Sequence, residues 1–550
     1  MSPDVVYMRL HRPIVAVLQI AAFLCGTTPA QAQLPGRARP AAGAKPHPAA
    51  RSDVARFRAR VEAALAEALA QKALWGVLVV DRDTGETLYE LNADRFFTPA
   101  SDAKAFTSAL ALATLGPDYR FHTTLEAKDA IGADGRLAGD LIFVGRGDPD
   151  LSNRKIPYAG KVERDGTVEK ILAELADAAV AKGLKEVDGD IVADDSYFPF
   201  DPYPAGWSIG DLYFAFGAPV SAIAFNENSI SIQVQAGARA GDSGSIVVEP
   251  GLALDSFGHE ITTGPPDAKP DFAVVRQPGS NFLLLRGLIP AGHEPIKLDL
   301  AMSEPAEIAA RVLKQLLEAR GVRVTGTIRV RHAPPPDTSD AGDLPPASAS
   351  TRPAVPNSVI LAEHVSLPLL ESIRLMNKIS QNLHAELLLR AVAREKTGTG
   401  STVSGLKVEQ EFLKAAGIAD GEVVFADGSG LSRDNLVTPR AVVGLLRYAL
   451  EQPWGADYVS TFPIAGVDGT LEGRMKGTSA SGLIQAKTGG LERVRAMSGY
   501  ARTQCGERLV FVIVGNNNPE HGHDAIVALD EIGVAMVETL GAPPPKRKKK

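Results

Sequence analysis

The chain has 550 residues, of which 45% are hydrophobic and 22% are charged, and its formal net charge at pH 7 is −7. This composition is typical of a globular protein with two or three cores, and the mean hydropathy of −0.01 argues against a polytopic membrane protein. The only cysteines are Cys25 and Cys505, which excludes a disulfide framework. No group of cysteines and histidines has the spacing of a metal site, so we expect no bound metal.

The first 32 residues have the pattern of an export signal. Arg9 and Arg12 precede an apolar run from Ile14 to Gly26, and the small residues of Ala30-Gln31-Ala32 supply a cleavage site. A membrane anchor is the alternative, but the apolar run is shorter than the ~20 residues that a spanning helix needs. We therefore expect an exported protein, either periplasmic or secreted.

The rest of the chain divides by composition. Residues 33–52 are rich in Pro and Ala and predict a linker, and residues 53–124 follow as the first folded part, with a helix, a strand and a hairpin turn. In residues 125–332, short strand-like runs alternate with Gly and Asp and are interrupted by two helical patterns, which predicts one or two inserted α+β or β-rich modules. A Pro/Ala/Ser-rich connector over 333–356 then leads to a second folded part over 357–540.

Residues 541–550 form a basic tail, in which positions 546–550 are all Lys or Arg. A solvated end is the simplest interpretation, and weak attraction to an anionic envelope surface is the functional alternative. The rest of the chain is acidic, and together with the export signal this argues against a nucleic-acid partner.

A serine and a lysine three residues apart open the first apolar helix. Ser101 and Lys104 precede the run Phe106–Leu115, and this spacing places both side chains on one helix face. Burial lowers the pKa of a lysine, which can then take the proton of a nearby serine. The same pattern recurs at Ser152–Lys155 and Ser404–Lys407, but the first lies in a predicted loop and the second has no buried helix behind it.

A second element, Ser380-Gln381-Asn382, lies between two helical patterns. At such a junction, the serine and the asparagine can both face a cleft. Taken alone, the element would be read as an ordinary helix cap, since both residue types favour that position.

A third element, Lys-Thr-Gly, occurs twice. Lys487-Thr488-Gly489 precedes two strand-like segments, which predicts an edge strand of an antiparallel sheet, where glycine lets a substrate backbone approach. Lys396-Thr397-Gly398 ends a long helical pattern, and its glycine is most simply a helix stop.

In this order, the three elements are the signature of class A β-lactamases and penicillin-binding proteins. The chain resembles more specifically the D-alanyl-D-alanine carboxypeptidase/endopeptidase family, the low-molecular-mass class C penicillin-binding proteins of peptidase family S13. Stretches 139–149, 217–228 and 427–433 also look like that family's landmarks, and the resemblance covers about 55 to 520. It implies an α/β (α+β) fold, in which a β-lactamase/transpeptidase-like domain with an antiparallel sheet flanked by helices carries smaller inserted domains.

The resemblance also implies the site and the chemistry. Ser101 would be the nucleophile, Lys104 its general base, and Ser380 the relay of a proton to the leaving amine. The substrate would be a peptidoglycan stem peptide, β-lactams would be covalent inhibitors, and no cofactor would be needed. The residues implied in substrate binding are Asn382, Lys487, Thr488, Gly489 and Gly490.

Two positions depart from the family pattern. Gln381 stands where Asp is common, and Gly490 stands where a hydroxyl residue is common. The backbone N–H of Gly490 can still serve an oxyanion hole together with that of Ser101. Asp427, Ser429 and Arg433 form either a structural turn near the cleft or a substrate contact.

Three other functions remain as alternatives. A class A β-lactamase is disfavoured because half of the chain separates Lys104 from Ser380 and because no Glu-x-x-x-Asn stretch follows the second element. A catalytically silent peptidoglycan-binding scaffold is disfavoured by the intact reactive residues. A secreted esterase with the same Ser/Lys chemistry is disfavoured by the long insert.

Overall fold

The computed structural model describes residues 51–67, 70–160, 164–251, 256–276, 282–335, 358–519 and 523–541. The predicted export signal, nearly all of the linker and the connector, and the basic tail after Gly541 lie outside the described residues. Among the helices that are described, none is long and apolar enough to cross a membrane.

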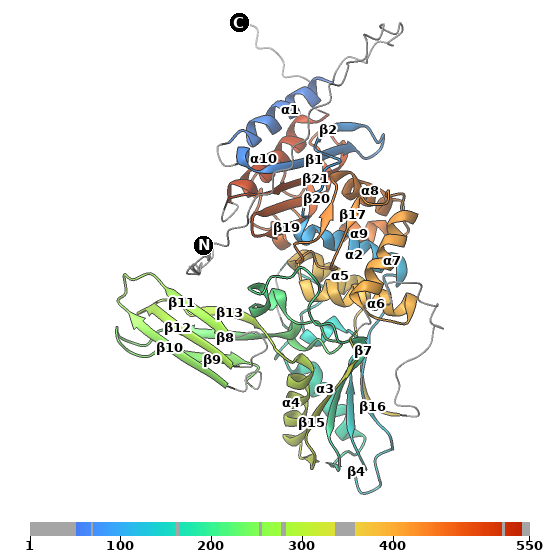
Figure 1. Cartoon of the computed structure of the whole chain (residues 1–550), viewed down its shortest axis with the longest axis vertical. Helices are drawn as coiled ribbons and strands as arrows, with labels where there is room; N and C mark the ends of the chain where they lie inside the picture. Colours follow the sequence, from blue (N-terminus) through green and yellow to red (C-terminus); the bar gives the residue numbers. More distant parts are fainter. Residues whose placement is uncertain are drawn as a thin grey trace, which may run out of the picture.

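An antiparallel sheet of five strands, in the order β19-β20-β21-β1-β2, forms the centre of the first domain (Figure 1). The two ends of the chain build it together, since Leu74 of β1 pairs with Asn516 of β21 and Asp81 with Leu509. β19 lies at the edge, as predicted for the strand that contains Lys487. The strands are β1 (Leu74–Asp81), β2 (Thr87–Leu91), β19 (Ile484–Leu491), β20 (Val494–Arg502) and β21 (Arg508–Asn516).

Alternating side chains of β1 enter two different cores. Val77 and Val79 pack with α1 and α10 on one face of the sheet, whereas Leu78 and Val80 pack with α2 and α8 on the other. This alternation follows from the two-residue period of a strand and makes a helix–sheet–helix sandwich. The covering helices are α1 (Ser52–Leu65), α2 (Lys104–Thr114), α8 (Pro439–Leu450) and α10 (His523–Thr539).

A layer of helices forms the rest of the first domain. Its central helix, α6, is buried on nearly every side and packs against α2, α5 and α7, as expected for a sequence that is apolar around most of its circumference. The elements of this layer are α5 (Leu369–Ile379), α6 (Asn382–Thr397), α7 (Thr402–Ala415), α9 (Gly455–Ser460), β17 (Val423–Val424) and β18 (Leu436–Val437).

The insert consists of two modules. The first is a mixed sheet in the order β15-β7-β5-β3-β16, with α3 and α4 packed in its core and a small sheet β14-β6-β4 at one end. Its elements are β3 (His122–Ala127), β4 (Arg136–Leu137), β5 (Leu141–Val144), α3 (Lys170–Ala181), β6 (Glu186–Val187), β7 (Ile191–Pro199), α4 (Pro305–Glu318), β14 (Arg323–Val324), β15 (Ile328–Ala333) and β16 (Val359–Val365).

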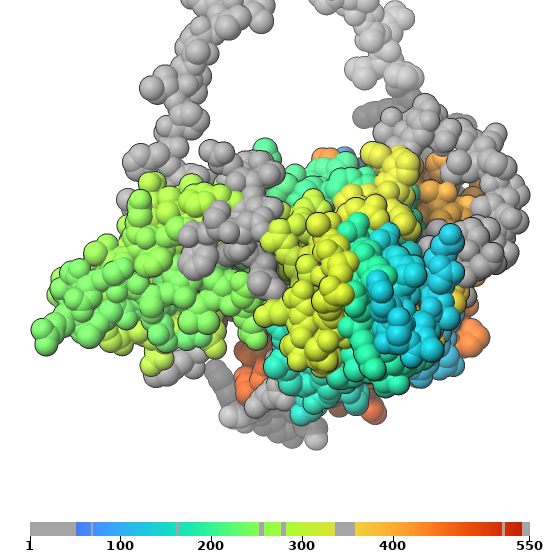
Figure 2. Space-filling model, turned by 90° about the horizontal axis from the view of Figure 1, so that it is seen from below, coloured from blue at the N-terminus to red at the C-terminus, as the bar shows by residue number. Residues whose placement is uncertain are grey.

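The second module is β-rich and protrudes sideways as the green lobe of Figure 2. It has two sheets of three strands, β13-β8-β9 and β10-β12-β11. The strands are β8 (Ser229–Gln235), β9 (Ser245–Glu249), β10 (Ser256–Gly264), β11 (Asp271–Arg276), β12 (Phe282–Pro290) and β13 (Ile296–Ala301). Short 3-10 turns connect the elements of the chain: η1 (Ala70–Lys72), η2 (Ala100–Ala103), η3 (Pro149–Ser152), η4 (Asp211–Tyr213), η5 (Ala215–Gly217), η6 (Phe225–Asn228) and η7 (Gly469–Leu471).

The insert is longer than the sequence predicts. The expected boundary at 124/125 falls inside β3, and β16 was expected in the second folded part but pairs antiparallel with β3, from Val359 opposite Ala127 to Val365 opposite His122. The strands that carry the chain out and back thus close the insert by pairing with each other. In the sequence, the connector 333–356 lies between two strands of this sheet and does not end the insert. The change in composition at the connector therefore does not mark the boundary of the insert.

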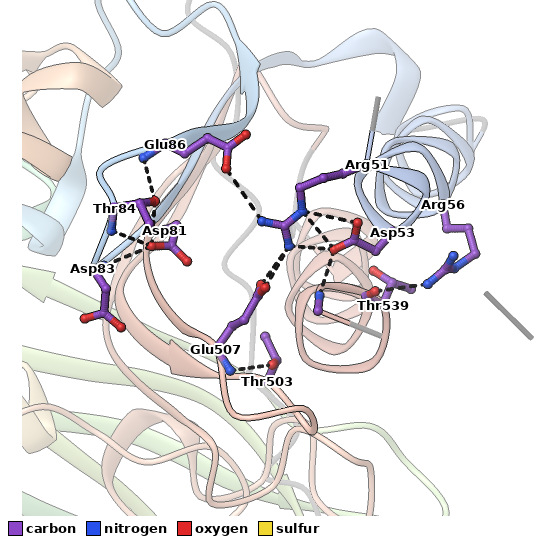
Figure 3. A network of polar contacts seen from close by, with 11 residues as sticks. Arg51, Asp53, Arg56, Asp81, Asp83, Thr84, Glu86, Thr503, Glu507 and Thr539 are labelled. Carbon is purple, nitrogen blue, oxygen red and sulfur yellow. Dashed lines mark hydrogen bonds and ion pairs between the residues drawn. The ribbon is translucent and has the colours of Figure 1, made fainter. Parts of the chain in front are cut away.

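The two ends of the described chain are held together by a polar network that we call the terminal clamp. It consists of Arg51, Asp53 and Glu507, labelled in Figure 3, and the backbone of Gly541. Arg51 donates to Asp53 over 2.6 Å and to Glu507 over 2.8 Å, and the Gly541 N–H donates to Asp53 over 2.8 Å. The clamp fixes the start of α1 to Gly541, two residues beyond the end of α10.

Candidate active site

Ser101 lies on the sharp turn η2, directly before α2. The preceding residue, Ala100, has a left-handed backbone conformation with φ of +51°, which is unfavourable for a residue with a side chain. In this turn, the Ser101 Oγ lies 2.9 Å from the Nζ of Lys104, at the first position of α2. The predicted serine–lysine pair is therefore formed.

Two glycines from distant parts of the chain hold this turn. A methyl group placed on Gly430 would lie 1.9 Å from the carbonyl oxygen of Ala100, and one on Gly489 would lie 2.3 Å from that of Pro99. No side chain fits at either position. Gly489 was expected to admit a substrate backbone, but the backbone that lies against it in this structure is that of the turn that carries Ser101.

The Lys104 side chain is fully buried and has three polar neighbours. Besides Ser101, its Nζ donates to the Asn382 Oδ1 and to the Ser429 carbonyl, both over 2.6 Å. Burial lowers the pKa of Lys104 well below 10.5, and the nearby positive charge of Lys487 lowers it further. A neutral amine fits these contacts, since it can donate to the amide and carbonyl oxygens and accept the proton of Ser101.

A buried acid places the carbonyl group that Lys104 contacts. Glu386, on α6, accepts the backbone N–H groups of Gly428 and Ser429, over 3.0 and 2.8 Å. Its other oxygen contacts Arg390 one turn later, over 3.1 Å. Burial raises the pKa of Glu386 to about 7. The loop that carries Ser429 is thus anchored to the central helix.

The turn after Ser429 is structural, as one of the two interpretations of the sequence predicted. Asp427 accepts the N–H groups of Gly430 and Ser432 and the side-chain amide of Asn435, over 2.8, 2.7 and 2.6 Å. Arg433 forms an ion pair with Asp211, at the start of η4 in the insert.

The second element lies at the junction between α5 and α6. Ser380 ends α5 in a left-handed conformation with φ of +62°, and Asn382 is the first residue of α6. Gln381 caps α6 by accepting the N–H of Leu383 over 2.8 Å, so it does not need the Asp that is common in the family pattern. Asn382 bridges Lys104 and the carbonyl of Phe216, to which its amide donates over 2.7 Å.

The third element faces the second across the site. Lys487 is fully buried on β19, and its Nζ donates to the Ser380 Oγ over 3.0 Å and to the Thr488 carbonyl over 2.7 Å. Burial lowers the pKa of Lys487, while the carboxylate of buried Asp102 opposes this shift. The hydroxyls of Thr488 and Thr470 lie 2.7 Å apart. The chain therefore brings two Ser–Lys pairs together, Ser101–Lys104 and Ser380–Lys487.

Comparison with known proteins identifies this arrangement. The model of the D-Ala-D-Ala carboxypeptidase 3 (S13) family matches residues 57–344 and 346–536. The chain belongs to this family. Its relatives include a D-alanyl-D-alanine carboxypeptidase of an Actinomadura species, 33% identical over 501 residues, which cover 89% of this chain and 86% of that protein.

Solved structures agree with the family. The crystal structure of penicillin-binding protein 4 (dacB) from Haemophilus influenzae matches with a TM-score of 0.72 and 25% identity, over 86% of this chain and 98% of that chain. The same protein, complexed with a β-lactam, matches with a TM-score of 0.65 and 24% identity. The predicted resemblance, fold class and hydrolase class are confirmed: this S13 chain is a serine-type D-Ala-D-Ala carboxypeptidase.

The other copies of the motifs lie elsewhere. Ser152 ends η3 and accepts the N–H of Glu227 over 2.8 Å. Ser404 was expected to have no buried helix behind it, but it lies in the first turn of α7, capped by Ser401, and α7 packs against α6. Gly398 ends α6 in a left-handed conformation with φ of +75°, so that copy of Lys-Thr-Gly is a helix stop.

Sequence reasoning missed four groups near the S13 motifs. They are Asp102, Glu386, the Ser429 carbonyl and the Thr470 hydroxyl. Glu386 could have been found from the sequence, because it is an acid inside an apolar helical pattern. The Ser429 contact had no such signal, because a backbone carbonyl leaves no mark in a sequence. Gly490, the last of the predicted site residues, is exposed on β19, and a methyl group placed on it would lie 3.9 Å from the Arg495 side chain.

Proposed function

We propose that Ser101 attacks the carbonyl of the penultimate D-alanine of a peptidoglycan stem peptide, with neutral Lys104 as its base. The 2.9 Å contact between the two side chains carries this proposal, because no carboxylate lies between them and burial favours the neutral amine. The N–H groups of Ser101 and Gly490 are the proposed oxyanion hole.

The second Ser–Lys pair serves the leaving group. The Ser380 hydroxyl, in contact with Lys487, passes a proton to the amine as the C–N bond breaks. The ammonium group of Lys487 and the Thr488 hydroxyl attract the terminal carboxylate, and Asn382 holds the peptide backbone. Water then hydrolyses the ester on Ser101 and frees the enzyme.

The same serine should react with penicillins, since a β-lactam presents a strained amide beside a carboxylate. The Haemophilus influenzae protein in complex with a β-lactam supports this extension.

We also propose that the enzyme acts outside the cytoplasm, where its polymer substrate lies, and the signal pattern of residues 1–32 supports this location.

Intact-mass analysis after incubation with a penicillin tests the nucleophile. We expect one covalent adduct, mapped to Ser101 and absent from Ser101→Ala. The matched control is Ser404→Ala, which removes the serine of another Ser-x-x-Lys copy and should be acylated as wild type. An adduct that persists in Ser101→Ala would contradict the assignment, and rapid penicillin hydrolysis would instead indicate a β-lactamase.

A further inference from the structure

The Thr470 hydroxyl lies 2.7 Å from the hydroxyl of Thr488, beside the segment that the proposed function assigns to the substrate carboxylate. We propose that Thr470 is a further substrate-binding residue, which holds the terminal carboxylate together with Thr488. This inference rests on the proposed function, since it adds a donor to the site that Lys487 and Thr488 form. Thr470 lies on η7, outside the three sequence motifs.

The two hydroxyls hold more protons than their own contact uses. One of them donates to the other, and in the part of the chain that the structure describes neither hydroxyl has a further partner. The second O–H is therefore available to a ligand that accepts a hydrogen bond. Thr470 is exposed and Thr488 is half-buried, so a ligand can reach the pair.

A carboxylate accepts more hydrogen bonds than the Lys-Thr-Gly segment can donate. Its two oxygens have about four acceptor positions. Two of the three N–H groups of Lys487 already donate to the Ser380 hydroxyl and to the Thr488 carbonyl. One N–H of Lys487 and the O–H of Thr488 then remain for the substrate, and a third donor fits beside them.

The strand itself carries no second hydroxyl next to Thr488. Side chains two residues apart lie on the same side of a strand, and the neighbours of Thr488 in this sense are Ala486 and Gly490. There is room for a side chain at position 490, since a methyl group placed there would lie 3.9 Å from the Arg495 side chain. Thr470 thus supplies, from a neighbouring segment, the hydroxyl that this side of β19 lacks.

The segment that leads to Thr470 is paired with the edge of β19. The Ala486 N–H donates to the Pro463 carbonyl over 2.9 Å, and the Ala465 N–H donates to the Ile484 carbonyl over 3.0 Å. These bonds lie at positions 484–486 of the strand. The pairing thus places the segment next to the part of β19 that leads into Lys487.

The turn directly before Thr470 is held from two sides. Buried Lys378, on α5, donates to Asp468 over 2.6 Å. Gly469 has φ of +60°, and a methyl group placed on it would lie 2.6 Å from the Lys378 carbonyl. The Gly469 N–H donates to the hydroxyl of Tyr158, in the insert, over 3.2 Å. Thr470 is therefore positioned before a carboxylate binds, and little order has to be created on binding.

Removal of the Thr470 hydroxyl tests this role. Thr470→Val keeps the shape of the side chain. We expect it to lower kcat/KM for D-alanine release from a pentapeptide by about ten-fold or more, mainly by raising KM, because a hydrogen bond to a charged group is lost. Thr470→Ser keeps the donor and should stay within about three-fold of wild type.

The matched control is Thr478→Val, between η7 and β19. The Thr478 hydroxyl is exposed and donates to the Met475 carbonyl over 2.7 Å. This variant should release D-alanine within about two-fold of the wild-type rate, because a surface substitution away from the site has little effect.

Two further comparisons separate carboxylate binding from a structural effect. A peptide amide, which lacks the carboxylate, should be cleaved by Thr470→Val at the wild-type rate. Adding Gly490→Ser to Thr470→Val returns a hydroxyl to the same side of β19 and should raise kcat/KM for the pentapeptide by about three-fold or more.

Penicillin acylation of the wild-type enzyme distinguishes failure of this inference from failure of the proposed function. If wild type is acylated and prefers the pentapeptide to the amide, and Thr470→Val shows the same preference, the role of Thr470 alone is overturned. If wild type is neither acylated nor able to release D-alanine, the proposed function is overturned, and the role of Thr470 with it.

Discussion

In the proposed mechanism, the two buried lysines of the site need opposite charge states. Lys104 must be neutral to take the Ser101 proton, and its neighbours are an amide oxygen, a carbonyl and a hydroxyl. Lys487 must be charged to attract a carboxylate, and buried Asp102 favours its ammonium form. Burial lowers the pKa of both lysines. At Lys104 this shift favours the neutral form that the mechanism needs, whereas at Lys487 the charge of Asp102 opposes it.

This difference predicts a bell-shaped pH dependence of kcat/KM for D-alanine release. The rate should rise with pH as Lys104 loses its proton, at a pKa far below 10.5, because burial and Lys487 both disfavour its charge. It should fall again before pH 10.5, because the pKa of Lys487 is also lowered and its deprotonation removes the attraction for the substrate carboxylate.

Steady-state rates across pH, with a matched peptide amide as control, check this prediction. The amide lacks the terminal carboxylate, so its turnover should be weaker and should not show the fall at high pH. An identical fall for both substrates would assign the alkaline limb to a group other than Lys487.

Glu386 is a positioning residue, since it accepts the N–H of Ser429, whose carbonyl Lys104 contacts; its negative charge also raises the pKa of Lys104, against the effect of burial. Glu386→Ala should slow penicillin acylation by about ten-fold or more and shift its acid limb, because a buried N–H without a partner costs ~1–3 kcal/mol and the loop moves. Glu386→Gln keeps an accepting oxygen and should restore much of the rate. Stopped-flow acylation at several pH values measures both, and equal loss in the two variants would contradict the role.

At the scale of elements, the turn that carries Ser101 depends on strands and loops far away in the sequence. Gly489 belongs to β19 and Gly430 to the loop after α7 and β17, and each lies against the backbone just before Ser101. The unfavourable conformation of Ala100 is therefore maintained from two sides.

A pair of glycine substitutions separates crowding from backbone conformation. Gly430 and Gly116 both have φ of +82°, but an added methyl group meets Ala100 at the first and open space at the second. Gly116→Ala should destabilise the fold by about 1–2 kcal/mol and leave acylation intact. Gly430→Ala should, in addition, displace the turn and slow acylation by about a hundred-fold. Thermal unfolding and acylation rates check both, and normal acylation of Gly430→Ala would refute the account.

The elements that the sequence predicted well are those whose signal is local. The edge strand around Lys487, the junction at Ser380 and the helix stop at Gly398 each follow from nearby residues. The pairing of β16 with β3 and the contact between Lys104 and Ser429 join segments far apart in the chain. One sequence carries no record of such pairings, so these features required the structure.

At the scale of the molecule, the terminal clamp predicts a response to acid. Arg51 and the Gly541 N–H lower the pKa of Asp53 from 3.8 to about 2. A carboxyl group with a lower pKa in the folded state stabilises the fold above pH 4 and loses this contribution as pH falls toward 2. The difference in melting temperature between wild type and Asp53→Asn should therefore be largest near neutral pH and shrink between pH 4 and pH 2.

Thermal unfolding at a series of pH values measures this difference. Glu507→Gln removes a second acid from Arg51 but leaves Asp53 in place. The melting temperature of this variant should therefore still fall between pH 4 and pH 2, by most of the amount seen in wild type. A constant gap between wild type and Asp53→Asn across the series would show that the Asp53 carboxyl does not stabilise the fold through its charge.

The pairing of β1 with β21 has a consequence for synthesis of the protein. Domains fold as units while the ribosome is still translating, and the insert, from β3 to β16, is one continuous segment that can close early. The central sheet cannot, because β1 must wait for residues 509–516 to emerge. Ser101 and Lys104 are translated in the first fifth of the chain, whereas Lys487 and Gly489 follow only near its end. A nascent or truncated chain that lacks β19–β21 therefore carries Ser101 and Lys104 without Lys487 and without the β19 glycine that lies against their turn.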